Sequence, residues 1–171
     1  MYKLLIFSIL FIVYSCSEEP KKKQEVDWDQ EKSTELNKNL SMEEEINIDL
    51  YLEEHKDWKV VKTGSGLRYW IYENGTGAQA ATSKTAEVEL IVELLDGKEC
   101  YRTAEDEVEV FEIDRADIES GIHEGIKHMR VGDRAKFILP SHLAHGLVGD
   151  LDKVPPLSTL VIDIHLIGLG E

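Results

Sequence analysis

The stretch of residues 118–146, IESGIHEGIKHMRVGDRAKFILPSHLAHG, predicts a short helix followed at once by a strand. In its first half the apolar residues are spaced by four, four and three positions, which gives a helix one apolar face; they are Ile118, Ile122, Ile126 and Met129. Gly132 follows and ends the helix. Apolar and polar side chains then alternate over 134–139, the period of a half-buried strand. The stretch therefore predicts a sheet with one helix lying across it.

Other segments share the alternating pattern of strands, at 67–72, 87–94 and 160–167, and the apolar-rich segment 108–113 predicts another strand. Asn74–Gly77 has the composition of a turn, and Asp96-Gly97 is typical of a two-residue hairpin loop. Links of hairpin length join neighbouring strands in antiparallel sheets. We therefore expect an α+β domain built on an antiparallel sheet.

The charge of the chain restricts its partners. The formal net charge is -15 over 171 residues. A chain this acidic has no basic stripe to neutralise phosphates, so nucleic acid is excluded as a partner. It would also be repelled by an anionic membrane surface, so any membrane attachment has to be covalent or apolar.

The N-terminus has the pattern of an export signal. One lysine precedes an apolar run at residues 4–14, which is too short to cross a bilayer, and Cys16 follows after a small residue. This ending resembles the lipobox of bacterial lipoproteins, in which the cysteine thiol carries the lipid; the alternative is an ordinary signal peptide with an incidental cysteine. With Cys16 lipidated, Cys100 has no partner, and no disulfide framework is expected.

A charged tether and a helix follow the signal. Residues 17–40 are rich in charges and poor in large apolar residues, which favours a solvated tether. Ser41 and Glu44 then have the spacing of a capping box. An apolar stripe follows in the helix, at Met42, Ile46, Ile48, Leu50 and Leu52. The stripe fits packing on the domain, with a partner helix as the alternative. We divide the chain into a signal peptide (1–15), a lipid-attachment site with a flexible tether (16–40), an N-terminal helix (41–60) and a domain (61–171).

From about Gly64 the chain resembles the FKBP-type peptidyl-prolyl cis-trans isomerases. The segments that carry the resemblance are Leu94–Lys98, Gly121–Gly132, Ala135–Pro140, Leu143–Gly146, Val154–Pro156 and Thr159–Ile164. With the lipobox and the preceding helix, the chain is similar to the gliding-motility-associated FKBP lipoproteins of the Bacteroidota. The resemblance implies an antiparallel half-barrel sheet of about five strands wrapped on one short helix.

The resemblance also implies an apolar pocket for an X-Pro bond. It assigns catalytic positions to Ile122, His145, Tyr101 and Ile162, and substrate-binding positions to Leu90, Cys100, Phe111, Ile118 and Glu119. Several of these differ from the family, because Ile122 stands where the family usually has Trp, His145 where it has Tyr, and Ile162 where it has another aromatic residue. The pocket would stay apolar, with mostly aliphatic walls, which implies low or selective isomerase activity.

Two functional classes are left open. The first is a peptidyl-prolyl isomerase of the cell envelope that acts on exported proteins; the second is a non-catalytic peptide-binding or structural lipoprotein of a gliding or secretion machine. Either would be lipid-anchored in the outer membrane, facing the periplasm or the cell surface, with proline-containing polypeptides or envelope proteins as partners. No cofactor is expected, and His142 and His145 alone are too weak a signal for a metal site.

Overall fold

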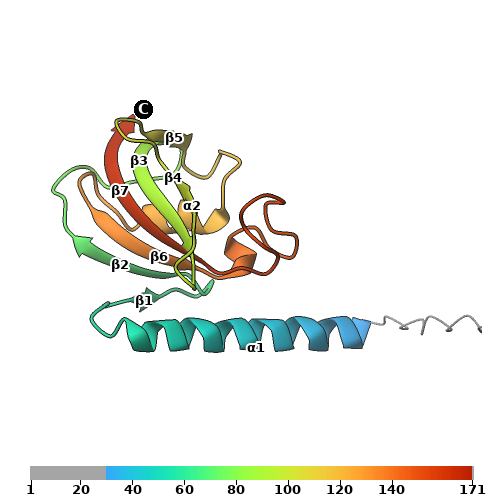
Figure 1. Cartoon of the computed structure of the whole chain (residues 1–171). Helices are drawn as coiled ribbons and strands as arrows, with labels where there is room; N and C mark the ends of the chain where they lie inside the picture. The colour runs from blue at the N-terminus through green and yellow to red at the C-terminus, as the bar shows by residue number, and fades with distance from the viewer. Residues whose placement is uncertain (1–29, 171) are drawn as a thin grey trace, which may run out of the picture.

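In the computed structural model, residues 30–170 are described, and within them the chain forms a seven-stranded antiparallel sheet and two α-helices (Figure 1). The strands are β1 (Val61–Lys62), β2 (Arg68–Glu73), β3 (Thr85–Leu94), β4 (Glu99–Arg102), β5 (Glu109–Glu112), β6 (Arg134–Leu139) and β7 (Leu160–Gly170). The helices are α1 (Gln30–Glu54) and α2 (Ser120–Ile126), and a 3-10 turn, η1, spans Ser141–Leu143. The expected α+β architecture is confirmed.

The sheet runs in the order β1-β2-β6-β7-β3-β4, and β5 also pairs with β3. The sheet has more than the five or so strands expected, because the long strand β3 has two short partners on one side. Its first half pairs with β5, from Thr85 to Val88, and its second half pairs with β4, from Ile91 to Glu93. The Asp96-Gly97 hairpin between β3 and β4 is present, with Gly97 at φ 81°.

Helix α2 packs closely against strand β6 because two glycines allow the approach. A Cβ atom on Gly121 would lie 2.4 Å from Cγ of Leu139, and one on Gly125 would lie 2.5 Å from Cε2 of Phe137. Phe137 and Leu139 are fully buried beneath the helix. The apolar face of α2 and the inner face of β6 therefore form one core, as the alternation of the opening stretch predicts.

Helix α1 lies across the outer face of the same sheet, along one side of the domain in Figure 1. Ile48 of α1 is fully buried against Ile138 of β6 and Val161 of β7, which alternation alone would place at the surface. Partly buried aromatic and aliphatic side chains surround this contact, at Tyr51, Leu52, Trp58 and Leu95. A second, smaller core therefore joins α1 to the domain.

Polar contacts fix the position of α1. The Glu44 carboxylate accepts hydrogen bonds from the backbone N–H of Ser141 (2.6 Å), the Ser141 hydroxyl (3.1 Å) and the Thr159 hydroxyl (2.8 Å). On the next residue, Glu45 forms an ion pair with the buried Arg68, with Nη2 and Oε1 2.6 Å apart. Hydrogen bonds from Lys62 and Arg68 lower the pKa of Glu45. These contacts tie the middle of α1 to η1 and to β2.

The predicted boundaries of this helix are wrong. Residues 30–40, expected as part of the flexible tether, are helical, and Ser41 lies inside α1 rather than at its start. No glycine or proline interrupts Gln30–Glu54, and the segment is rich in Glu, Lys and Leu, which favour helix. The helix also ends at Glu54, before the expected residue 60. The signal peptide, Cys16 and the first part of the tether lie outside the described residues.

The predicted packing stripe is confirmed for Ile48 and Leu52 and wrong for its other three residues. Met42, Ile46 and Leu50 are 53%, 53% and 54% exposed, whereas Ile48 is fully buried. Both the exposed residues and Ile48 lie on rows of the helix with a spacing of four positions, so the periodicity of α1 alone does not say which row meets the sheet. The row that meets it is the one that also places Glu44 against Ser141 and Thr159. Among the described helices, none is long and apolar enough to cross a membrane.

Candidate functional site

The inner face of the sheet brings most of the predicted pocket residues into one apolar cluster. Ile122, Ile162, Cys100 and Phe111 are buried members of this main core. Leu90, Tyr101 and Ile118 are partly buried and pack against it. The cluster joins side chains from α2, β3, β4, β5 and β7, which are far apart in the sequence. Their roles in binding stay predictions.

Strand register explains why two of these residues share a face. Val92 of β3 pairs with Tyr101 of β4 on one side and with Ile162 of β7 on the other. Directly paired residues of an antiparallel sheet project to the same side, and Leu90 follows the same alternation two positions earlier. Ile122 is 3% exposed on α2, which covers this side. The geometry therefore places Ile122 and Ile162, which would form the aliphatic floor of the predicted pocket, on the same side of the sheet as the phenol of Tyr101.

The hydroxyl of Tyr101 is bound to a carboxylate from the loop between η1 and β7. It donates a hydrogen bond to Asp150, which also accepts from the backbone N–H groups of Asp152 (2.9 Å) and Val154 (2.8 Å). Burial alone would raise the pKa of Asp150, but these hydrogen bonds together lower it well below its usual value. The bond to Asp150 in turn raises the pKa of Tyr101 to about 12. Tyr101 is thus a neutral phenol held in a fixed direction.

A lysine lies over the ring of Tyr101. Nζ of Lys153 is 4.6 Å from the centroid of Tyr101, within the range of a cation–π contact. Asp150 and Lys153 were not among the predicted site residues. The sequence does contain a signal for Asp150, because an aspartate at a turn typically accepts hydrogen bonds from the backbone N–H groups of residues a few positions later. For Lys153 the sequence has no comparable signal.

Glu119 and His145 meet at the edge of the cluster. Nε2 of His145 lies 2.9 Å from Oε1 of Glu119, and both side chains are partly buried. Glu119 is the residue before α2, yet its carboxylate makes no capping bond to that helix. His145 follows η1, whose first residue is held by Glu44 of α1. The imidazole predicted as a substrate donor is therefore already engaged with a carboxylate.

The remaining predicted residues face inward. The Phe111 ring meets His123 edge to face, with centroids 5.9 Å apart, and the His123 ring accepts at Nδ1 from the backbone N–H of Asp114 (3.0 Å). Its Nε2 lies 3.0 Å from the carbonyl oxygen of Ala116. His123 thus supports the loop before α2, which carries Ile118 and Glu119. Burial raises the pKa of the Cys100 thiol, which keeps it protonated and apolar in character.

No group of three or more His, Cys, Asp or Glu side chains within residues 30–170 is arranged to hold a metal ion. The site combines buried aliphatic side chains, a fixed phenol and the Glu119–His145 contact at its edge. Such a site can bind and desolvate an uncharged group, and it has no nucleophile paired with a base.

Comparison with known proteins gives one consistent family. The model of the FKBP-type peptidyl-prolyl cis-trans isomerases matches residues 77–167. The chain is 36% identical over 119 residues to the FKBP-type peptidyl-prolyl cis-trans isomerase FkpA of Escherichia coli (strain K12), covering 68% of this chain and 43% of the relative. It is 32% identical over 111 residues to the probable FkpA of Neisseria meningitidis serogroup B, covering 65% and 40%. The chain thus spans less than half the length of these relatives.

Solved structures agree in fold. The crystal structure of FkpA from Escherichia coli matches with a TM-score of 0.67 and 29% identity, over 81% of this chain and 64% of that chain. The crystal structure of AtFKBP13 matches with a TM-score of 0.60 and 24% identity, over 64% of this chain and 98% of that chain. The second likeness concerns the fold alone.

Proposed function

Because the chain belongs to the FKBP-type peptidyl-prolyl cis-trans isomerase family, we propose that it isomerises X-Pro bonds in polypeptides at the apolar floor around Ile122. The observation that carries this proposal is that Ile122 of α2 covers the side of the sheet to which Ile162 and Tyr101 project. The apolar ring of proline can pack against an aliphatic floor, and rotation of the amide before it needs no charged partner.

The chemistry follows from the electronic structure of the amide. Rotation about the X-Pro bond loses resonance and has a barrier of roughly 18–20 kcal/mol. The planar amide is more dipolar than the twisted one, so an apolar pocket destabilises the ground state relative to the transition state. No general acid or base is required. Tyr101 and the backbone near Glu119 supply the polar groups beside the floor.

The proposed activity is low. An aromatic floor holds a proline ring by stacking as well as by burial, and Ile122 and Ile162 offer burial alone. Glu119 and His145 also contact each other at the edge of the cluster, so a substrate has to displace or pass this pair. Both features reduce substrate binding without removing the apolar environment.

A protease-coupled assay with a proline tetrapeptide tests the proposal. We expect a rate above the uncatalysed reaction, inhibited by an FKBP-directed macrolide, and a higher rate in the Ile122→Trp variant. Ile46→Trp, on the exposed side of α1, is the matched control and should leave the rate unchanged. Trp at position 122 can overpack the core. The rate of cis–trans exchange of the peptide in the presence of the wild-type protein is therefore also measured by NMR. No catalysed exchange in the wild type would exclude the enzyme.

For location, we propose a lipoprotein of the bacterial envelope, anchored in the outer membrane through Cys16 and acting on exported proteins. Support comes from the apolar run of residues 4–14 that ends before Cys16. Mass spectrometry of the protein from the membrane fraction should show a diacylglyceryl cysteine at its N-terminus. An unmodified Cys16, or a Cys16→Ser variant that stays in the membrane, would contradict this.

The second candidate is a non-catalytic peptide-binding or structural lipoprotein of a gliding or secretion machine. The aliphatic residues at Ile122 and Ile162 favour it, because they leave the apolar environment in place where the catalytic family usually has aromatic side chains. Binding of a proline peptide without faster exchange is the result that would distinguish this module from the enzyme.

A further inference from the structure

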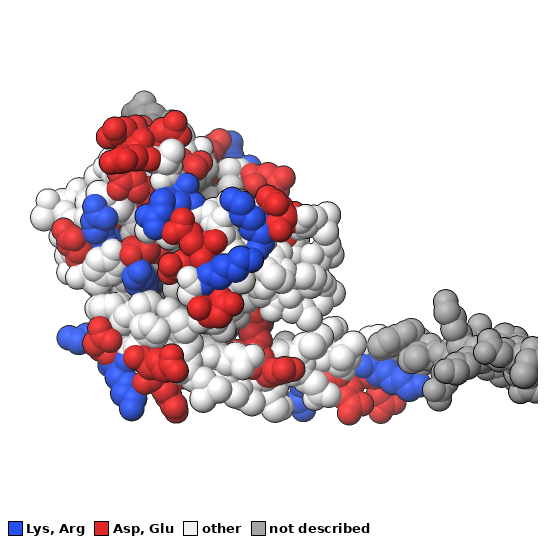
Figure 2. All heavy atoms as spheres, in the orientation of Figure 1, with Lys and Arg blue, Asp and Glu red and all other residues white. Residues whose placement is uncertain are grey.

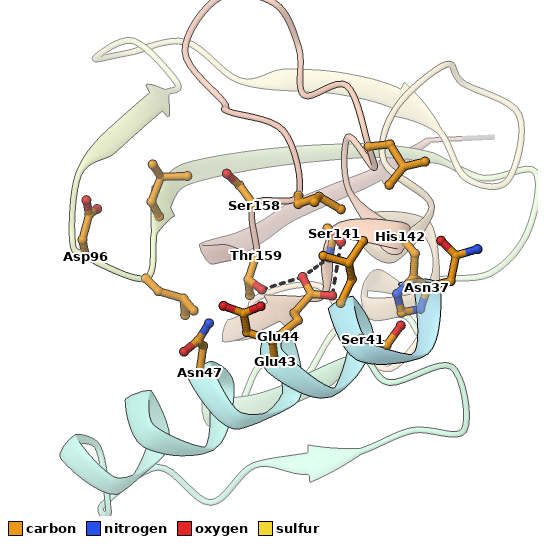
Figure 3. Close-up of a pocket in the computed structure, with 15 residues that line it drawn as sticks. Asn37, Ser41, Glu43, Glu44, Asn47, Asp96, Ser141, His142, Ser158 and Thr159 are labelled. Carbon is orange, nitrogen blue, oxygen red and sulfur yellow. Dashed lines mark hydrogen bonds between the residues drawn. The ribbon is translucent and has the colours of Figure 1, made fainter. Parts of the chain in front are cut away.

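A groove runs between part of α1 and the domain, on the side where the loop 144–158 leaves η1. Its volume is about 610 Å³. One wall is the α1 segment between Asn37 and Asn47, and the other combines the end of β3 with the residues around η1 and Leu157 (Figure 3). The α1 wall is about 15 Å long at 1.5 Å per residue, which matches four or five residues of extended polypeptide.

The lining combines leucines with carboxylates. Its apolar residues are Leu40, Leu94, Leu95, Leu147 and Leu157. Its charged residues are Glu43, Glu44 and Asp96, and no lysine or arginine lines the groove. Figure 2 shows the wider surface, where acidic and basic side chains are interspersed over the domain and along α1. The groove therefore differs from the surface around it in having one sign of charge.

The carboxylates differ in what they already bind. Glu44 accepts three hydrogen bonds from Ser141 and Thr159, drawn as dashed lines in Figure 3, and so belongs to the framework. The Glu43 side chain makes no hydrogen bond or ion pair with another described residue, and among these residues the Asp96 carboxylate accepts only from the backbone N–H of Lys98 (3.0 Å). Glu43 and Asp96 therefore remain able to receive a cation at opposite walls.

The loop beside the groove carries large apolar side chains into solvent. Leu147 and Val148 are 66% and 59% exposed, and Leu157 is 40% exposed. A hydrogen bond from the N–H of Leu157 to the carbonyl oxygen of Gly146 (2.9 Å) closes the base of this loop. The same loop carries Asp150, which binds Tyr101 at the candidate proline site. The loop 144–158 therefore contributes residues both to the groove and to the site where a proline-containing polypeptide is proposed to bind.

We propose that this groove is a second polypeptide-binding site, which takes an extended apolar segment carrying lysine or arginine. The leucines would bury alternate apolar side chains, and Glu43 and Asp96 would pair with the basic ones. The hydroxyl and amide groups of Ser41, Asn37 and Ser158, which Figure 3 places around the groove, suit the backbone of an extended segment. The site goes beyond isomerisation, because it needs no proline.

Fluorescence anisotropy with a labelled, proline-free peptide of sequence KLVALVK tests the proposal on the purified protein. Two groove residues are changed together, in the variant Leu147→Ser/Leu157→Ser. Leu151→Ser is the matched control, because Leu151 is 86% exposed on the same loop and does not line the groove. The changed leucines are exposed, so both variants should keep the wild-type melting temperature.

We expect the wild type and Leu151→Ser to bind the peptide within twofold of each other, and the double variant to bind at least tenfold more weakly. Glu43→Lys should also weaken binding, and the acidic peptide ELVALVE should bind poorly to the wild type. Three results would overturn the proposal. They are no binding of KLVALVK by the wild type, a loss of affinity in Leu151→Ser equal to that in the double variant, or equal affinity of the wild type for the two peptides. Sedimentation showing a dimer that the double variant dissociates would assign the groove to a second copy of the chain instead. A failed proline assay leaves these outcomes unaffected, because the peptide has no X-Pro bond.

Discussion

Replacing Ile48 by Ala tests whether α1 is part of the folded domain or an appendage to it. Ile48 is fully buried between Ile138 and Val161, so truncation leaves a cavity that the sheet on one side cannot close. Buried Ile→Ala changes cost about 2–5 kcal/mol in free energy of unfolding. At roughly 2–4 °C per kcal/mol for a chain of this size, a middle value of about 3 kcal/mol lowers Tm by about 6–12 °C.

Ile46→Ala is the control, because Ile46 is 53% exposed on the same helix, two positions away. Alanine has the higher helix propensity, so this change should stay within about 0.5 kcal/mol of the wild type. Thermal unfolding is followed by far-ultraviolet circular dichroism for the helix and by near-ultraviolet signals for the domain aromatics. The two transitions should coincide and shift together in Ile48→Ala. A variant that loses helix signal early while the domain unfolds at the wild-type temperature would refute the reasoning, as would equal effects of the two substitutions.

Two further predictions concern the core and the candidate site. Gly125→Ala would place a Cβ 2.5 Å from Cε2 of Phe137, so we expect the free energy of unfolding, measured in urea, to fall by about 1–3 kcal/mol. Gly64→Ala is the control, because a Cβ there has no atom within 4 Å, and it should lose far less. Equal losses in the two variants would show that α2 can shift away from β6. Folding lowers the pKa of Asp150 below the ordinary value of an aspartate, so the stabilising contribution of its hydrogen bonds is complete above that ordinary value and is lost as pH falls below it. The stability advantage of the wild type over Asp150→Asn should therefore shrink between about pH 5 and pH 2 in denaturation experiments, and an advantage that grows in acid would contradict the hydrogen bond from Tyr101.

Local sequence predicted the elements whose partners lie nearby in the chain. The spacing of Ile122 and Ile126 set the buried face of α2, and Asp96-Gly97 set the hairpin between β3 and β4. Both depend on interactions within a few residues, namely helical periodicity and turn conformation. The candidate pocket residues were placed by resemblance to a family, and the register of β3 with β4 and β7 explains how Tyr101 and Ile162 come to share a face.

The contacts of α1 lay beyond this kind of reasoning. The exposed row at Met42, Ile46 and Leu50 is more apolar than the row that contains Glu44 and Ile48, so periodicity could not identify the row that packs. The choice depends on the outer face of the sheet, where Ile138 and Val161 leave an apolar surface beside Ser141 and Thr159. Only a helix turned to bring both Ile48 and Glu44 to that face satisfies the two sets of contacts at once.

By itself, the sequence determined an antiparallel sheet with one short helix across its inner face, because those features follow from alternation, helical spacing and turn residues. The tertiary structure alone decided that Ile138 and Val161 are covered by α1, that Tyr101 binds Asp150, and that Glu119 meets His145. Each of these joins residues far apart in the chain. Their contacts depend on strand register and helix docking, which no local pattern contains.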